Sequence, residues 1–236
     1  MGSAVGYAMD GFDLLILGFM LSAISKDLNL TPGQAGSLVT WTLIGAVFGG
    51  IVFGMLSDKY GRIRVLTWTI VLFAVFTGLC AFAQGYWDLL IYRTIAGIGL
   101  GGEFGIGMAL AAEAWPARHR ARVSSYVALG WQLGVLGAAM LTPLLLPSIG
   151  WRGMFLVGVI PAVVAWVIRN KLHEPEVFVN RSKKEQPSAM QCLKLLMKDK
   201  ATRKISLGVI VLTSVQNFGY YGIMIWMPSF LSKQMG

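Results

Sequence analysis

Charged residues are scarce in this sequence, and acidic residues are scarcer than basic ones. Only 13% of the 236 residues are charged, with 11 Asp or Glu against 20 Lys or Arg, whereas 56% are hydrophobic. A soluble domain carries about 25% charged residues. The composition therefore argues against a water-soluble protein, and the meaning of the net charge of +9 depends on where the basic residues lie.

Cysteine and histidine are also rare, with two residues of each kind. Cys80 lies in an apolar stretch and Cys192 in a basic one, so we expect neither a disulfide nor a metal site. The sequence also offers no nucleophile–base set of the kind that covalent catalysis requires. We therefore expect no enzyme activity, no metal and no bound cofactor.

Long apolar stretches are what the sequence has in abundance. A helix needs about 20 apolar residues to cross a bilayer, and a helix satisfies all its backbone hydrogen bonds within one segment. We therefore expect an all-α membrane protein with seven transmembrane helices. The stretches cover residues 4–25, 35–57, 65–83, 87–113, 122–146, 151–168 and 205–231.

The basic residues lie at alternate ends of these stretches. Such asymmetry marks the cytoplasmic loops of membrane proteins, so we predict a cytoplasmic N-terminus and a location in the inner (plasma) membrane. The positive charge is then explained without a nucleic-acid partner. The residues concerned are Lys59, Arg62, Arg64, Arg118, Arg120, Arg122 and ten Lys or Arg within residues 169–204.

The spacing of the stretches divides the chain into three parts. Short connections join the first six, so residues 1–169 are expected to form one six-helix bundle. Residues 170–204 form a basic cytoplasmic linker, in which apolar residues at helical spacing predict a short amphipathic helix on the membrane surface. Residues 205–236 are then expected to contain the first helix of a second, incomplete bundle.

Residues 96–107 read AGIGLGGEFGIG and satisfy the dinucleotide-binding pattern G-x-G-x-x-G. That pattern needs a strand before it, and here an apolar run comes first. In a helix, Gly97, Gly101 and Gly105 share a face on which a neighbouring helix can approach closely, so packing is favoured over nucleotide binding. The same spacing recurs in Gly45 with Gly49, Gly50 with Gly54, and Gly130 with Gly134.

Polar side chains occur inside four of the apolar stretches. A charge at the bilayer centre costs about 2.5–3.5 kcal/mol on insertion scales, and transporters place substrate and ion sites near the midplane. At about 1.5 Å per helical residue, four polar side chains lie about 14–17 Å from the cytoplasmic ends. These predicted midplane residues are Asp13, Glu103, Gln132 and Gln216.

Asp10 and Asp13 are three residues apart and therefore neighbours on one helix face. Two carboxylates in a low dielectric do not readily ionise together, so the pair suits a proton carrier. We predict proton coupling for Asp13, Asp10 and Glu103. The alternative is that these acids hydrogen-bond to neighbouring helices and only stabilise the fold.

The segment GMLSDKYGRIR, residues 54–64, resembles the signature between helices 2 and 3 of the major facilitator superfamily, G-x-x-x-D-[RK]-x-G-[RK]-[RK]. Ile63 stands where the family often has a second basic residue, and Arg64 follows at once. The resemblance implies that this loop latches the two halves of a carrier on the cytoplasmic side. The match lies at Gly54, Asp58, Lys59, Gly61 and Arg62.

Three further segments resemble that superfamily. The first looks like its R-x-x-x-G-x-G pattern, and the other two are similar to the exit of helix 4 and the start of helix 6 in its sugar-porter and organic-ion branches. The resemblance reaches helices 1–7 of twelve, and implies a bundle of two inverted three-helix repeats whose partner, the C-terminal half of the carrier, is missing. It also leads us to expect Glu113 and Arg120 to pair at the cytoplasmic mouth. The segments are LLIYRTIAGIGLGGE (89–103), EAWPARHR (113–120) and GWRGMFLVGVIPA (150–162).

Arg93 lies in the fourth stretch at the place where the family often has a functional arginine. Because its guanidinium stays charged and matches a carboxylate in a two-pronged manner, its partner is either a substrate anion or a buried acid such as Glu103 or Asp13. Both alternatives stay open.

The segment QNFGYYGIMIWMP, residues 216–228, resembles the aromatic-rich helix 7 of organic-acid carriers. Aromatic faces with amide donors suit a small ring or carboxylate ligand, although an aromatic packing surface is the alternative. Trp131 and Gln132 are candidates for the same cavity. The predicted substrate-binding residues are Arg93, Trp131, Gln132, Gln216, Asn217, Tyr220 and Tyr221.

The segment DGFD, residues 10–13, is similar to D-G-[FY]-D in helix 1 of aromatic-acid proton symporters. The leading hypothesis is therefore a secondary active carrier that uses the proton gradient to move a small organic acid by alternating access. A sugar or organic-cation carrier of the same superfamily is one alternative. A truncated, non-transporting remnant is the other.

Overall fold

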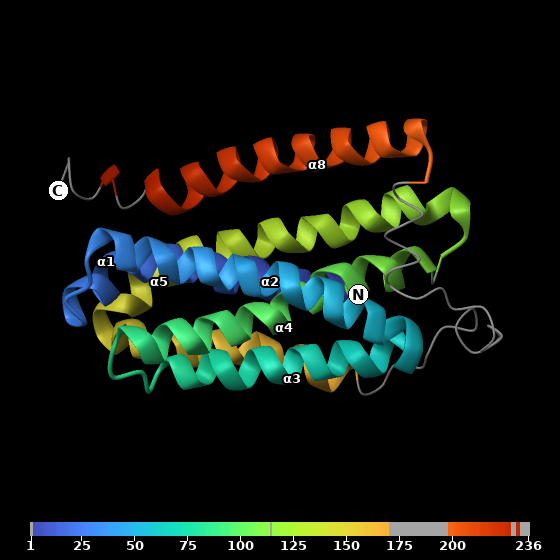
Figure 1. Cartoon of the computed structure of the whole chain (residues 1–236). Helices are drawn as coiled ribbons and strands as arrows, with labels where there is room; N and C mark the ends of the chain where they lie inside the picture. Colours follow the sequence, from blue (N-terminus) through green and yellow to red (C-terminus); the bar gives the residue numbers. More distant parts are fainter. Residues whose placement is uncertain (1, 114, 170–197, 228–229, 232–236) are drawn as a thin grey trace. The chain divides into compact units, whose positions relative to one another are not determined.

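The computed structural model describes residues 2–113, 115–169, 198–227 and 230–231. The chain divides into two compact units, residues 1–180 and 181–236. In the first unit the helices are α1 (Gly2–Asp27), α2 (Pro32–Tyr60), α3 (Arg62–Cys80), α4 (Tyr86–Glu113) and α5 (Ala117–Arg169) (Figure 1). The second unit contains α8 (Lys200–Tyr221) and the π-helix η1 (Gly222–Trp226).

No strand occurs in the described ranges, and six helices there are long and apolar enough to cross a membrane. The predicted all-α membrane fold is thereby confirmed. The third apolar stretch was predicted to end at residue 83, but α3 ends at Cys80. The last was predicted to begin at residue 205, but α8 begins at Lys200. Asp199 caps α8, because its carboxylate accepts hydrogen bonds from the backbone N–H and the hydroxyl of Thr202.

α5 contains two of the predicted stretches, residues 122–146 and 151–168, on either side of Gly150. Gly150 has φ 66° and ψ 178°, which glycine adopts readily because it has no Cβ. Figure 1 shows the two parts of α5 running in opposite directions on either side of this residue. The glycine thus joins two antiparallel helices without a separate loop.

Local signals also set the start of α2. Thr31 Oγ1 accepts a hydrogen bond from the backbone N–H of Gln34, and Gln34 Oε1 accepts one from the backbone N–H of Thr31. This reciprocal capping box satisfies two donors that a helix start leaves open. Pro32 occupies the first helical position, where the missing N–H has no consequence. Gly61, with φ 107°, then separates α2 from α3.

Glycines bring α2 and α4 into backbone contact. A Cβ on Gly97 would collide with the carbonyl oxygen of Thr42, and one on Gly101 with that of Ala46. From the other side, Gly45 and Gly49 abut the backbone of α4 in the same way. The predicted close packing is confirmed for these four glycines.

The same device joins α1 to α5, where Gly130 and Gly134 abut the backbone carbonyls of Ala4 and Ala8. For two other glycines the packing prediction is wrong. A Cβ on Gly54 or Gly105 would meet no atom within 4 Å. The spacing identified a possible face, but α2 and α4 do not stay in close contact along all of it.

Residues 170–197, which include Cys192 and most of the segment predicted to form the amphipathic helix, lie outside the described residues. The three-part division of the chain stays a prediction, and so does the inverted three-helix repeat within residues 1–169.

Candidate functional site

A buried ion pair joins α1 to α4 inside the first unit. Arg93 Nη1 lies 2.8 Å from Asp13 Oδ2, and it donates a hydrogen bond of 3.1 Å to Oδ1. The side chains are 0% and 1% exposed. Of the alternatives left open by the sequence, the structure selects Asp13 as the acid that Arg93 contacts.

An aromatic ring and a glycine lie beside this ion pair. The Phe155 ring, from the second part of α5, lies with its centroid 5.7 Å from Arg93 Cζ. A Cβ on Gly158 would lie 4.0 Å from Asp13 Oδ1 and 3.7 Å from Thr77 Cγ2. Charges removed from water in this way are costly unless they are paired, so the acid and the base depend on each other.

The guanidinium of Arg93 uses only part of its donor capacity. Within the described residues, buried Nε and Nη2 have no hydrogen-bond acceptor. Arg has five N–H donors in a planar fork, and a buried donor without an acceptor is unfavourable. The guanidinium therefore has donor capacity beyond its contact with Asp13.

Asp10 and Glu103 lie on the same two helices, α1 and α4, and their side chains are 0% and 1% exposed. The structure therefore places all three predicted proton-coupling acids inside the bundle and none on its surface. Tyr7 stacks on Phe104, the neighbour of Glu103, with ring centroids 4.7 Å apart.

Trp131 extends this aromatic group, because Phe104 meets it edge-on at 6.1 Å. The next residue, Gln132, is exposed. The rise per residue along the helix predicted the depth of Gln132 in the membrane. The direction in which its side chain points depends on how α5 is rotated about its axis, which the rise does not give. The structure thus brings Trp131 to the acid-bearing helices and does not bring Gln132 there.

The predicted residues of the last helix belong to the second unit. Gln216 and Asn217 are exposed, and Asn217 Nδ2 donates 2.9 Å to the backbone carbonyl of Thr213. Tyr220 and Tyr221 meet edge-to-face with ring centroids 5.4 Å apart. These contacts are all local to the helix.

The predicted gating loop is ordered by polar contacts around Gly61. Arg62 Nη2 lies 2.9 Å from Asp58 Oδ1, and Arg62 Nη1 donates 2.8 Å to Ser57 Oγ. Gly54, one turn earlier, faces open space. Asp58 and Arg62 therefore hold each other across the break between α2 and α3.

The expected partner of Arg120 was Glu113, whose side chain lies outside the described part of the chain. Arg120 Nε donates 3.2 Å to the backbone carbonyl of Trp115. This contact fastens the start of α5 to the preceding turn.

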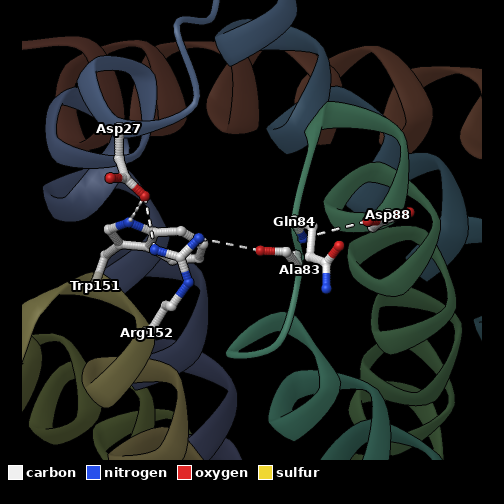
Figure 2. Close-up of polar contacts among 6 residues, drawn as sticks. All are labelled: Asp27, Ala83, Gln84, Asp88, Trp151 and Arg152. Atoms are coloured by element: carbon white, nitrogen blue, oxygen red, sulfur yellow. Dashed lines mark hydrogen bonds and ion pairs between the residues drawn. The ribbon is translucent and has the colours of Figure 1, made fainter.

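Sequence reasoning missed a polar group at one end of the helices, which we call the helix-end cluster: Asp27, Ala83, Trp151 and Arg152 (Figure 2). Asp27 Oδ2 accepts hydrogen bonds from Trp151 Nε1, at 3.1 Å, and from Arg152 Nη1, at 2.7 Å. Arg152 Nη2 donates 3.2 Å to the backbone carbonyl of Ala83. Only the Trp-Arg pair after Gly150 could have drawn attention to it, and nothing in the sequence named its partners.

Within the described residues, no three His, Cys, Asp or Glu side chains are grouped so as to hold a metal ion. Among the side chains that the structure describes, the buried charged groups are one arginine and three acids. Such a site can exchange protons and bind an anion.

Residues 3–236 match the family model described as Major Facilitator Superfamily. The chain is 79% identical over 240 residues to a Haemophilus influenzae protein whose name assigns it to metabolite transport, covering 100% of this chain and 59% of that protein. It is 32% identical over 232 residues to the cis,cis-muconate transport protein of Acinetobacter baylyi, covering 97% of this chain and 56% of that protein.

The fold is similar to the crystal structure of a D-xylose–proton symporter, with a TM-score of 0.77 at 22% identity. The match covers 100% of this chain and 61% of the symporter chain. The chain thus spans less than two thirds of the length of these proteins. It belongs to the major facilitator superfamily of membrane transporters, and the predicted resemblance is confirmed.

Proposed function

We propose that this chain supplies the proton-coupling bundle of a secondary active transporter for a small organic acid. The observation that carries the proposal is the buried Arg93–Asp13 pair, in which the arginine keeps Nε and Nη2 available among the described residues. A second bundle completes the substrate cavity, and rocking of the two bundles exposes the site to each side in turn.

Protonation of Asp13 is the coupling step. A proton on the carboxylate removes its charge, weakens its attraction to Arg93, and leaves the guanidinium with a full positive charge in a low dielectric. A substrate carboxylate then compensates that charge through the arginine fork. Because proton and anion favour the same state of the bundle, their movements are coupled.

The relatives support an organic acid as the substrate. The Acinetobacter baylyi relative is named for transport of cis,cis-muconate, a carboxylate. An arginine with two available donors matches such a group, and the Tyr7–Phe104–Trp131 rings offer apolar faces to its carbon skeleton. We assign Asp10 and Glu103 to the proton route. Gln132, Gln216, Asn217, Tyr220 and Tyr221 are assigned to the substrate cavity.

The basic loops favour a cytoplasmic N-terminus and an inner-membrane location. On that orientation the contact between Asp58 and Arg62 faces the cytoplasm and belongs to the gate. The helix-end cluster faces the opposite side.

Uptake into proteoliposomes by the complete carrier tests the proposal. Completion can be made by joining the chain to the C-terminal region of the 79% identical relative. Candidate substrates are muconate, nicotinate, xylose and an organic cation. We expect Asp13→Asn to abolish uphill, proton-driven uptake of the acid while exchange of internal for external acid continues.

Asp88→Asn is the matched control, because Asp88 is an exposed acid of α4 whose carboxylate accepts a hydrogen bond from the backbone N–H of Gln84. Unchanged accumulation by Asp13→Asn would refute the proton role. Uptake of xylose or of the organic cation, without uptake of the acids, would refute an organic acid as the substrate. If no compound is taken up, the result would support a non-transporting protein.

A further inference from the structure

Phe155 occupies a position between the buried ion pair and the end of the bundle. Its side chain is fully buried, and its ring faces Arg93 Cζ at 5.7 Å from the ring centroid. The Trp151 ring also contacts it in a T-shaped arrangement, with centroids 6.0 Å apart and planes at 89°. Phe155 is therefore held by one aromatic neighbour and covers the cation with its face.

Trp151 is itself fixed from the helix-end cluster. Its Nε1 donates to Asp27 Oδ2, which also accepts from Arg152. The cation of Arg152 in turn lies 4.1 Å from the centroid of the Trp151 ring. Trp151 therefore has three contacts, with Asp27 through its nitrogen, with the Arg152 cation and with the Phe155 ring, which leave it little freedom to reorient.

These contacts form a continuous path that begins and ends on α1. It starts at Asp27, passes through Trp151 and Phe155 to Arg93, and returns to α1 at Asp13. The two acids are separated by about 21 Å along α1 at 1.5 Å per residue. The second part of α5 thus supports Arg93 from the end of the bundle.

An aromatic face attracts a cation without occupying its N–H groups, which point outward in the plane of the guanidinium. Arg93 can therefore keep its contact with the Phe155 ring while its in-plane donors change partner from Asp13 to another carboxylate. An aliphatic side chain of similar size would fill the space but would not attract the charge.

We propose that Phe155 is a positioning residue for Arg93: its ring retains the guanidinium at one place while the donors exchange between Asp13 and the substrate carboxylate. The transport part of this inference rests on the proposed function. The positioning part concerns the protein without substrate and can be tested separately.

The first test is a double-mutant cycle on thermal unfolding of the purified chain in detergent. Phe155→Leu is made in the wild-type chain and in an Asp13→Asn/Arg93→Gln background, where both charges are removed together so that no buried ion is left unpaired. We expect Phe155→Leu to lower the unfolding midpoint by about 2–4 °C more in the wild-type chain than in the neutral background.

Phe73→Leu is the matched control, because Phe73 of α3 is equally buried and packs against Gly99 of α4. Phe73→Leu should lower the unfolding midpoint equally in both backgrounds, since this substitution removes only packing contacts. Phe155→Tyr keeps the aromatic face and should restore most of the loss. Equal losses from Phe155→Leu in both backgrounds would overturn the positioning role.

The second test is acid uptake by the completed carrier. Phe155→Leu should raise the KM for the acid about tenfold or more, and Phe155→Tyr should return it to near the wild-type value, whereas a purely structural loss would lower the amount of active carrier and leave KM unchanged. If the KM for the acid instead stays unchanged while the double-mutant cycle still shows the larger loss in the wild-type chain, the ring positions Arg93 but has no role in the exchange of its donors between Asp13 and the substrate. That result would contradict the transport part of the inference. If the wild-type carrier moves no acid, the proposed function fails while the thermal cycle still decides the positioning.

Discussion

Arg93 of α4 contacts Asp13 of α1 through Nη1 alone, at 2.8 Å from Oδ2, although the two residues are 80 positions apart in the sequence. Because both side chains are buried, loss of either partner leaves a charge without compensation. The geometry that keeps Nε and Nη2 available at the same arginine makes the pair suitable for exchange between two anions.

Arg93→Lys tests whether the guanidinium of Arg93 binds the substrate carboxylate through two N–H groups at once. Lysine keeps the charge but presents one compact ammonium group and cannot bind a carboxylate in a two-pronged manner. We expect binding of acids to the completed carrier to weaken about tenfold or more, which corresponds to about 1.4 kcal/mol, while binding of the matching amides changes less. Thermal-shift titration measures both series, and equal losses for acids and amides would count against a carboxylate partner.

Gly101→Ala tests the contact of α4 with α2. A Cβ at Gly101 would collide with the carbonyl oxygen of Ala46, so the helices must separate, and overpacking of this kind costs about 1–3 kcal/mol. Gly105→Ala is the control on the same helix face, because a Cβ there meets no atom within 4 Å. Thermal unfolding in detergent should show a lower midpoint for Gly101→Ala and an unchanged or higher one for Gly105→Ala. A similar fall for both would mean that α4 does not pack as described.

Asp27→Asn tests the helix-end cluster. Asp27 and Arg152 are 47% and 44% exposed, so solvent should screen their ion pair, its contribution to stability should be small, and it should be smaller still at high salt. The asparagine oxygen can still accept a hydrogen bond from Trp151 Nε1. The loss of stability should therefore report the removed charge and not a removed hydrogen bond. A double-mutant cycle with Arg152→Gln, measured at low and high salt, gives the coupling. A coupling that does not depend on salt would indicate that the pair is shielded from solvent.

The start of α8 should depend on pH through Asp199. The pKa of Asp199 is lowered, first by the hydrogen bond from the Thr202 backbone N–H and then by that from its hydroxyl. Because the folded-state pKa is below the ordinary value of about 4, the cap contributes fully above that value and is lost as the pH falls through the lowered pKa.

Hydrogen exchange of the first turn of α8, compared between variants at each pH, measures this loss. Asp199→Asn keeps a capping oxygen and does not titrate, so its protection should stay constant where that of the wild type falls. Asp199→Ala should lack the protection throughout. Identical pH profiles for the wild type and Asp199→Asn would contradict the assignment.

Much of the fold was predictable because it depends on properties that lie along the chain. The length of an apolar run indicates a membrane-spanning helix, and the capping box at Thr31 with Pro32 marks the start of α2. The spacing of Gly97 and Gly101 indicated a packing face for the same reason, since residues four apart lie on one side of a helix.

The sequence by itself thus determined the all-α membrane fold, the glycine faces and the presence of acids within the apolar stretches. Only the tertiary structure decided that Arg93 pairs with Asp13, that Gln132 is exposed, that Gly105 has no neighbour, and that Asp27 meets Trp151 and Arg152. The reason is physical: periodicity defines which residues share a helix face, but which face meets which depends on how each helix is rotated and placed among the others.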